Sequence, residues 1–119
     1  LVLTQKNTFG TSFNCTINKK VKWENFNIKQ KTNIYLIVQE LLQNVNKHSN
    51  AEKCFVFILE KEDSLIIRVH DDGIGFKYNQ EKKGLGLKSI KDRLTDLNGR
   101  MKITSKFGNT TVFVEISIQ

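Results

Sequence analysis

Hydrophobic and polar residues alternate near the start of the chain and then change to a helical spacing. Phe13, Cys15 and Ile17 alternate with asparagine and threonine, which predicts a half-buried strand. From about residue 33 to residue 47, apolar side chains recur at steps of 4, 3 and 4 residues, at Ile34, Val38, Leu41 and Val45. This spacing predicts an α-helix with one apolar face, and Thr32 is its expected N-cap. Residues 20–30 fit either strand or loop.

The rest of the chain predicts two hairpins separated by a second helix. β-branched and aromatic residues concentrate in two pairs of short runs, each pair joined by a polar turn. The expected strands are residues 54–59, 65–69, 101–105 and 111–118, with turns at 60–64 and 107–110. Between the pairs, Ile90, Leu94 and Leu97 share one face of a helix expected over residues 85–97, and Gly99 is its expected C-terminal cap.

This order of elements favours one fold class. The helices fall between antiparallel pairs and not between successive parallel strands, so a doubly wound fold is disfavoured. We expect a two-layer α/β sandwich of the α+β type. Its sheet should be mixed but mostly antiparallel, with helices over one face and the other face partly open.

Composition sets further limits. The 119 residues show no break in composition, so we expect one domain over residues 1–119, and the absence of an initial methionine suggests a piece of a longer protein. The net charge of +7 would suit a polyanion, but the lysines are scattered without interleaved aromatics, so no direct nucleic-acid binding is expected. Cys15 and Cys54 lack metal or disulfide spacing, which fits reduced thiols in a cytoplasmic domain. No apolar run approaches the roughly 18 residues of a membrane span.

Polar side chains border the apolar face of the first predicted helix. At 100° per residue, Glu40, Asn44 and Lys47 form one stripe, and His48 continues it. An amide oxygen can ligate a divalent cation, a lysine can neutralise phosphate, and a carboxylate can orient or deprotonate a nucleophile. An ordinary amphipathic helix with a solvated edge is the alternative.

The strand at 65–71 ends in two aspartates of opposite orientation. Asp71 continues the apolar face of the strand, where a carboxylate needs hydrogen-bond donors such as the amino group of a purine. Asp72 points the other way and is expected to be solvated or to cap the turn. Gly73 and Gly75 let a planar ligand approach the main chain closely, although turn glycines are common.

The polar segment 76–83 is expected to form a lid over bound ligand. Gly84 and Gly86 then lead into the second helix, whose N-terminus favours phosphate. Two familiar nucleotide motifs fail here. Leu87 separates the glycine from the lysine of a Walker A loop, and Ser89 replaces the third glycine of a dinucleotide fingerprint.

Together these segments resemble the ATP-binding catalytic domain of sensor histidine kinases in the GHKL superfamily. Residues 40–48 (Glu-Leu-Leu-Gln-Asn-Val-Asn-Lys-His) look like the N box, residues 71–75 (Asp-Asp-Gly-Ile-Gly) like the G1 box, and Gly84-Leu85-Gly86 like the G2 box. The runs at 34–40 and 86–94 further resemble nitrate-sensor-like and degradation-sensor-like kinases.

The resemblance implies a Bergerat-type ATP-binding fold and a role for each matching residue. Asn44 would bind Mg²⁺, Glu40 would be the base or orienting carboxylate, and Lys47 and His48 would contact phosphate. Asp71 would hold the adenine amino group beside Gly73 and Gly75. Gly84, Leu85 and Gly86 would form the phosphate side of the lid, and Thr110 would support the adenine site. Asn109 stands where the family usually has glycine.

The implied activity is transfer of the γ-phosphate of Mg-ATP to a histidine. That histidine would lie on a helical dimerisation domain of the same kinase, with onward transfer to a response regulator. The piece itself is expected to be monomeric and cytoplasmic, although the parent kinase could be membrane-anchored. Two alternatives stay open, an anti-sigma-type protein serine kinase and a non-catalytic nucleotide-sensing module.

Overall fold

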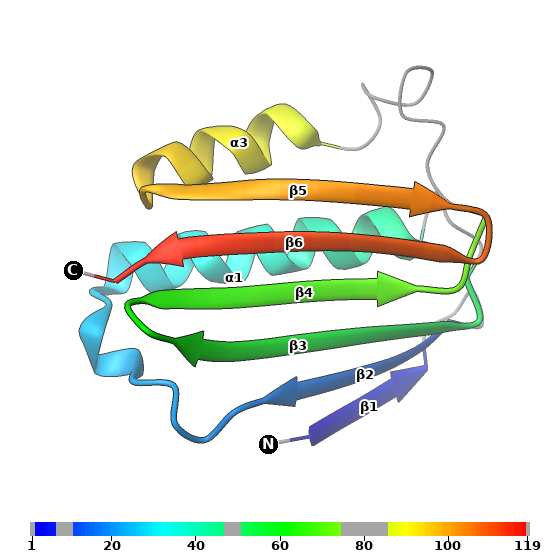
Figure 1. Cartoon of the computed structure of the whole chain (residues 1–119), viewed down its shortest axis with the longest axis horizontal. Helices are drawn as coiled ribbons and strands as arrows, with labels where there is room; N and C mark the ends of the chain where they lie inside the picture. The colour runs from blue at the N-terminus through cyan, green and yellow to red at the C-terminus, as the bar shows by residue number, and fades with distance from the viewer. Residues whose placement is uncertain (1, 7–10, 47–50, 75–85, 119) are drawn as a thin grey trace.

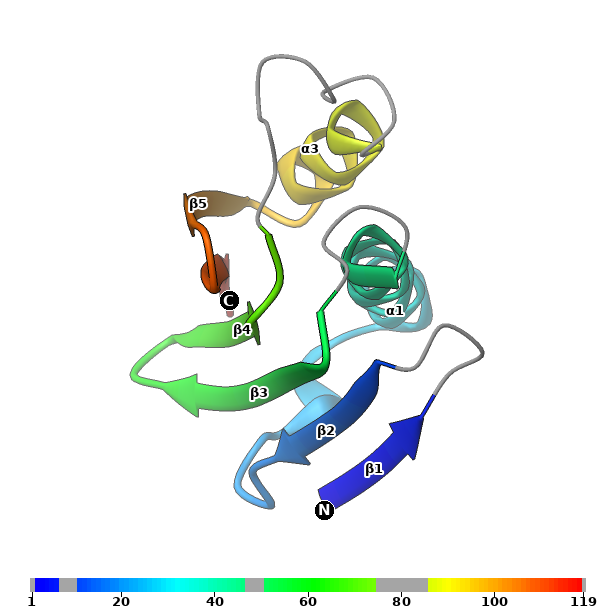
Figure 2. The same ribbon diagram turned by 90° about the vertical axis from the view of Figure 1, so that its right-hand side faces the viewer.

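A computed structural model describes residues 2–6, 11–46, 51–74 and 86–118. Its backbone forms a six-stranded sheet in the order β1-β2-β3-β4-β6-β5, with α1 and α3 on the same face (Figures 1 and 2). The bounds are β1 Val2–Lys6, β2 Ser12–Ile17, η1 Trp23–Asn25, α1 Ile28–Asn44, β3 Lys53–Lys61, β4 Ser64–Asp71, α3 Leu87–Asp96, β5 Gly99–Lys106 and β6 Asn109–Ser117.

The sheet is mixed and mostly antiparallel, as predicted. β2 pairs with β3 in parallel, and the other neighbouring pairs are antiparallel. The helices cover one face, which we call the inner face, and the opposite face carries no helix of the described chain (Figure 2). The two-layer sandwich is therefore confirmed. β1 was not predicted and pairs with β2 at the edge of the sheet.

The first helix begins earlier than its apolar spacing predicted. Asn27 is the N-cap, and its side chain accepts from the backbone N–H of Gln30 at 2.8 Å. The Gln30 side chain accepts in return from the Asn27 backbone, which completes a capping box. The prediction that Thr32 caps the helix is wrong, because Thr32 lies inside α1 and its hydroxyl donates to the carbonyl of Ile28.

The core lies between the inner face and the two helices. Ile37, which the predicted apolar stripe omitted, is fully buried at its centre, whereas Val38 is only half-buried. On α3, Leu87, Ile90 and Leu94 are buried as a helical stripe predicts.

In the described residues, no helix is long and apolar enough to cross a membrane.

Asn98, and not Gly99, ends α3 in the left-handed conformation, with φ at 55°. The prediction that Gly99 caps this helix is therefore wrong, since Gly99 is the first residue of β5. A Cβ there would meet the Glu115 carbonyl oxygen and Leu94 at 3.0 Å. Close packing, and not backbone conformation, accounts for this glycine.

Candidate nucleotide site

Four residues form a polar row across the inner face at one end of the sheet. The strand register aligns Cys54 of β3 with Asp71 of β4, Asp71 with Thr110 of β6, and Thr110 with Ser105 of β5. All four lie where β4 ends, and α1 ends at the same end of the molecule (Figure 1). The register therefore brings together residues from four strands beside the end of a helix.

Asp71 has the burial that its place in the strand pattern predicted. It is 1% exposed, and its Oδ1 accepts from the backbone N–H of Gly73 at 2.9 Å. This local bond turns the chain away from the sheet as β4 ends. The carbonyl of Gly73 accepts from the N–H of Gly108 at 2.7 Å, which ties the β5–β6 turn to this segment. A buried carboxylate in such a place is suited to a ligand that brings hydrogen-bond donors.

Asp72 has a structural role. Its exposed carboxylate accepts from the backbone N–H groups of Glu52 and Lys53 at 2.9 and 3.0 Å. Asp72 thereby holds the start of β3 against the end of β4. The prediction that Asp72 is solvent-exposed is confirmed, but its carboxylate bonds the backbone at residues 52 and 53 and does not cap its own turn.

Thr110 is fully buried, and its hydroxyl lies 3.1 Å from that of Ser105. The left-handed φ of the connecting turn falls on Gly108, at 80°, while Asn109 lies in β6. The turn therefore does not require glycine at position 109. Sequence reasoning missed Ser105, although a two-residue hairpin turn would have aligned Ser105 with Thr110.

Cys54 completes the row as a buried thiol. Burial, and after it the nearby carboxylates of Asp71 and Asp72, raise its pKa to about 12. Burial also raises the pKa of the Cys15 thiol. Cys54 thus stays protonated at neutral pH and contributes packing, not an ionised nucleophile.

Glu40 and Asn44 lie one helical turn apart near the end of α1. Asn44 is 3% exposed, and Glu40 is half-buried. Glu40 reaches Gly86, the N-cap of α3, so closely that a Cβ at Gly86 would lie 2.7 Å from its Cδ and closer still to its Oε1. The structure therefore brings the end of α1 against the N-terminus of α3, where free backbone N–H groups favour an anion.

The donors at this end of α1 fit a hard cation. The amide of Asn44 is buried there, and two residues on, the amide oxygen of Asn46 is buried with no hydrogen-bond partner among the described residues. Amide and carboxylate oxygens are the ligands that Mg²⁺ prefers. In the described part of the chain, no three His, Cys, Asp or Glu side chains gather as a metal cluster. A magnesium ion here would therefore depend on few protein ligands together with phosphate oxygens.

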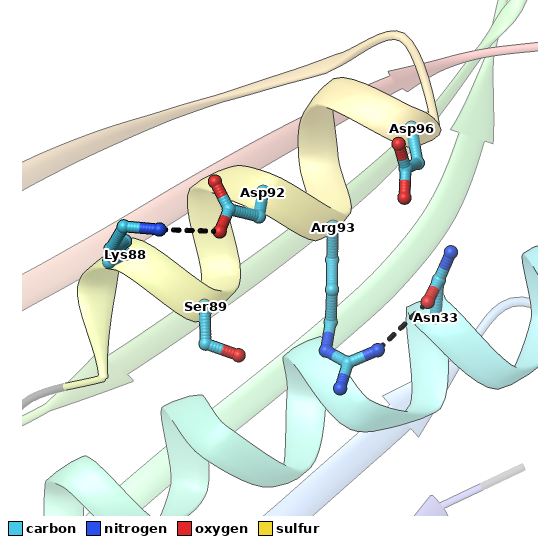
Figure 3. A pocket seen from close by; sticks show the side chains of 6 residues that line it. All are labelled: Asn33, Lys88, Ser89, Asp92, Arg93 and Asp96. Atoms are coloured by element: carbon cyan, nitrogen blue, oxygen red, sulfur yellow. Dashed lines mark hydrogen bonds and ion pairs between the residues drawn. The ribbon is translucent and has the colours of Figure 1, made fainter.

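Away from this row, a polar cleft of about 560 Å³ runs along α3 and reaches Asn33 of α1 (Figure 3). Across it, Arg93 donates to the Asn33 side-chain oxygen at 2.9 Å, and on α3 Lys88 pairs with Asp92 at 3.1 Å. Arg93 lies in the run that resembles the degradation-sensor-like kinases, but its role was not predicted from the sequence. Its bond ties the two helices together and so orients α3, whose N-cap is Gly86.

Several predicted site residues lie outside the described residues, namely Lys47, His48, Gly75, Gly84, Leu85 and the lid 76–83. Of the described predictions, Asp71 and Thr110 lie together in the polar row, with Gly73 bonded to Asp71. Glu40 lies against Gly86, and Asn44 lies one turn from Glu40 on the same helix.

The chain is similar in sequence to known proteins. The family model described as histidine kinase-, DNA gyrase B- and HSP90-like ATPase matches residues 29–119. The protein kinase/phosphatase DegS of Brevibacillus brevis is 33% identical over 99 residues, covering 82% of this chain and 26% of its own length. Sensor histidine kinase LiaS of Bacillus subtilis is 39% identical over 79 residues, covering 66% of this chain and 22% of its own length.

Solved structures show the same fold. The histidine kinase domain of the blue-light activated kinase EL346 of Erythrobacter litoralis superposes with a TM-score of 0.75 at 19% identity, over 87% of this chain and 50% of that chain. The Acinetobacter baumannii histidine kinase AdeS superposes with a TM-score of 0.66 at 19% identity, over 75% of this chain and 47% of that chain. The curated relatives are much longer than this chain. Sensor histidine kinase ComP of Bacillus subtilis is 32% identical over 84 residues, which cover 68% of this chain but 11% of ComP. The chain belongs to the histidine kinase-, DNA gyrase B- and HSP90-like ATPase family.

Proposed function

We propose that this domain binds Mg-ATP and donates the γ-phosphate to a histidine on a helical dimerisation domain of the same kinase. The observation that carries the proposal is the burial of Asp71 at the end of the sheet where Glu40 meets Gly86. The carboxylate of Asp71 is proposed to face the adenine, and the end of α1 together with the N-terminus of α3 is proposed to face the phosphates. Membership of a histidine kinase-like ATPase family supports the same reading.

At the adenine end, Asp71 accepts a hydrogen bond from the exocyclic amino group. Its Oδ1 already accepts from Gly73, which fixes the orientation of the carboxylate. Thr110, held by its contact with Ser105, supports the base from β6. Gly73 and Gly75 carry no side chain, so the planar base can lie against the backbone.

At the phosphate end, Asn44 holds Mg²⁺ through its amide oxygen, while Lys47 and His48 contact phosphate oxygens. Gly84, Leu85 and Gly86 form the phosphate side of the lid and lead into α3, whose first N–H groups favour an anion. Bound Mg²⁺ supplies charge neutralisation of the triphosphate.

Transfer depends on positioning and electrostatics more than on covalent chemistry by this domain. A nitrogen of the acceptor histidine forms a bond to the γ-phosphorus as the bridging P–O bond breaks and ADP leaves. Glu40 orients the imidazole and accepts its N–H proton. The contact of Glu40 with Gly86, the N-cap of α3, supports this role.

The domain acts within a longer, cytoplasmic part of a two-component sensor kinase. The relatives are several times longer than this chain, and their names describe sensor kinases. The remainder of the kinase would supply the acceptor histidine, and a response regulator would receive the phosphoryl group. The isolated domain is monomeric.

Calorimetric titration with Mg-ATP tests the adenine assignment. Asp71→Asn keeps an oxygen for Gly73 but presents an NH₂ donor to the adenine amino group, so affinity should fall by about 1.5–3 kcal/mol, about 10- to 140-fold. Asp72→Asn is the matched control, since the exposed Asp72 carboxylate accepts from the backbone N–H groups of Glu52 and Lys53 at the start of β3. Equal affinities for wild type and Asp71→Asn would remove the assignment.

Reconstituted phosphotransfer separates the reaction classes. Labelled ATP is supplied with either a kinase dimerisation domain or an anti-sigma antagonist protein, and the product is treated with acid. Acid-labile label on the dimerisation domain supports histidine transfer, whereas acid-stable label on the antagonist indicates a serine kinase. Glu40→Ala should abolish transfer while Mg-ATP still binds. Full transfer by that variant would show that Glu40 is not the base.

A further inference from the structure

The face of the sheet away from α1 and α3 carries an apolar patch. On β3 the side chains of this open face include Phe55, Phe57 and Leu59, while β4 adds Ile66 and β6 adds Phe113. Phe57 is 38% exposed, and its ring stacks on that of Phe55 at 6.5 Å and 13°. Phe55, Leu59 and Phe113 are half-buried and Ile66 is buried, so Phe57 is the most exposed of these side chains. Apolar side chains that gather on one face of a monomer commonly mark an interaction site. We call these five residues the open-face patch.

The patch is hollowed at the β3–β4 turn. A cavity of about 390 Å³ there is lined by Leu59, Ile66 and Phe113. Lys61, Glu62, Ser64 and Glu115 form the polar remainder of its lining. An apolar floor with a polar rim is the usual anatomy of a site that receives an apolar side chain of a partner.

The open face is also strongly basic. By the alternation of the strands, the described outer positions of β3, β4, β5 and β6 hold six lysines and arginines and one acidic residue, Glu115. The basic residues are Lys53, Lys61, Arg68, Arg100, Lys102 and Lys106. Six positive charges less one give +5 on this face, against +7 for the whole chain. Arg100 pairs with Glu115, so that carboxylate is already neutralised.

Aromatic and cationic side chains alternate in one row across the face. The register places Phe57 opposite Arg68, Arg68 opposite Phe113, and Phe113 opposite Lys102. Among the described residues, neither Arg68 nor Lys102 forms an ion pair. Both cations are therefore available to carboxylates of a partner lying across β4, β6 and β5.

The charges select the class of partner. A second copy would bring another +5 face, and like charges opposed across an interface are unfavourable. A nucleic-acid backbone would meet the cations with its phosphates but would bring no apolar side chain to the cavity floor of Leu59, Ile66 and Phe113. An acidic polypeptide with apolar side chains satisfies both the cations and the apolar floor.

We propose that the open face docks an acidic amphipathic segment of a protein partner. Its apolar side chains fill the cavity over Leu59 and Ile66, and its carboxylates pair with Arg68 and Lys102. These two cations lie two strands apart, about 10 Å at the usual strand spacing. Two turns of an α-helix span a similar distance, about 11 Å. A helix with acidic residues two turns apart on the edge of a leucine stripe therefore matches the surface.

Fluorescence anisotropy with a synthetic helical peptide of that design tests the proposal. We expect Arg68→Glu to weaken peptide binding by about tenfold or more, equivalent to about 1.4 kcal/mol. Lys31→Glu is the matched control, since it makes the same change of charge at an exposed position of α1 and should leave binding within about twofold. Phe57→Ala should weaken binding by loss of apolar contact. Mg-ATP binding by each variant reports that the domain is folded.

Other outcomes would overturn the proposal. Equal losses in Arg68→Glu and Lys31→Glu would mean non-specific attraction to the net charge. Absence of peptide binding by wild type would remove the open face as the site. So would NMR chemical-shift changes, on addition of the peptide, that are confined to backbone amides of α1 and α3. Tighter binding of oligothymidylate or of phosphatidylglycerol vesicles, lost in Arg68→Glu, would assign the face to nucleic acid or lipid instead.

Discussion

Gly86→Ala tests the contact between the two helices of the candidate site. Gly86 has φ at 63°, a conformation that costs a residue with a side chain about 1–2 kcal/mol. Its new Cβ would also lie 2.7 Å from Cδ of Glu40, so the Glu40 side chain must leave its present position. Because that side chain is flexible, we expect a further cost of about 0.5–1.5 kcal/mol. The total loss should be about 1.5–3.5 kcal/mol.

Gly108→Ala is the matched control. Gly108 has φ at 80°, but nothing lies within 4 Å of a Cβ there, so only the backbone cost applies. Urea unfolding followed by the fluorescence of Trp23, the single tryptophan, measures both variants. With a slope of about 1–3 kcal/mol per molar urea, the midpoint should fall by about 0.5 M or more for Gly86→Ala and by less for Gly108→Ala.

Removing Glu40 should separate the two costs. In a Glu40→Ala background, Gly86→Ala should cost no more than Gly108→Ala, because only the backbone term is left. An equal loss from the two glycine variants in the native background would refute the contact. A Gly86→Ala cost that Glu40→Ala does not reduce would refute it as well.

Three further predictions concern buried groups. The pKa of Cys54 is about 12 in the folded protein against 9.0 ordinarily, and this shift gives stability that is present below pH 9 and lost toward pH 12. The free energies of unfolding of wild type and Cys54→Ala, measured as a function of pH, should therefore converge by about 1.4 kcal/mol per pH unit in that window. Arg93→Ala leaves the buried Asn33 oxygen without its partner and should cost about 1–3 kcal/mol in urea unfolding, a loss that should shrink in an Asn33→Ala background. Ser105→Ala should cost about 1 kcal/mol and weaken Mg-ATP binding, because the Thr110 hydroxyl loses its orientation; unchanged stability and affinity would argue against that contact.

Periodicity predicted much of the fold because most of its elements have one buried face. The β3–β4 and β5–β6 hairpins and the stripe of α3 are where alternation and helical spacing placed them. The start of α1 was missed, because the capping box of Asn27 and Gln30 is a polar signal that precedes the apolar stripe. β1 was missed because an edge strand is defined by its pairing with β2, which one segment of sequence does not reveal.

Residues whose burial follows from strand alternation were predictable at the site, and residues whose role depends on register were not. Asp71 continues the inward face of β4, so its burial could be derived from the sequence alone. Ser105 and Cys54 join the row only through pairing across strands. The bond from Arg93 to Asn33 joins residues 60 positions apart, a contact that no local pattern contains.

A crystal structure of the domain soaked with Mg²⁺ and a non-hydrolysable ATP analogue tests the central claim most directly. The account predicts the adenine amino group within hydrogen-bond distance of Asp71, and the triphosphate between Asn44 and the N-terminus of α3. A nucleotide bound in the cleft of Arg93 and Asn33, or on the open face of the sheet, would contradict it.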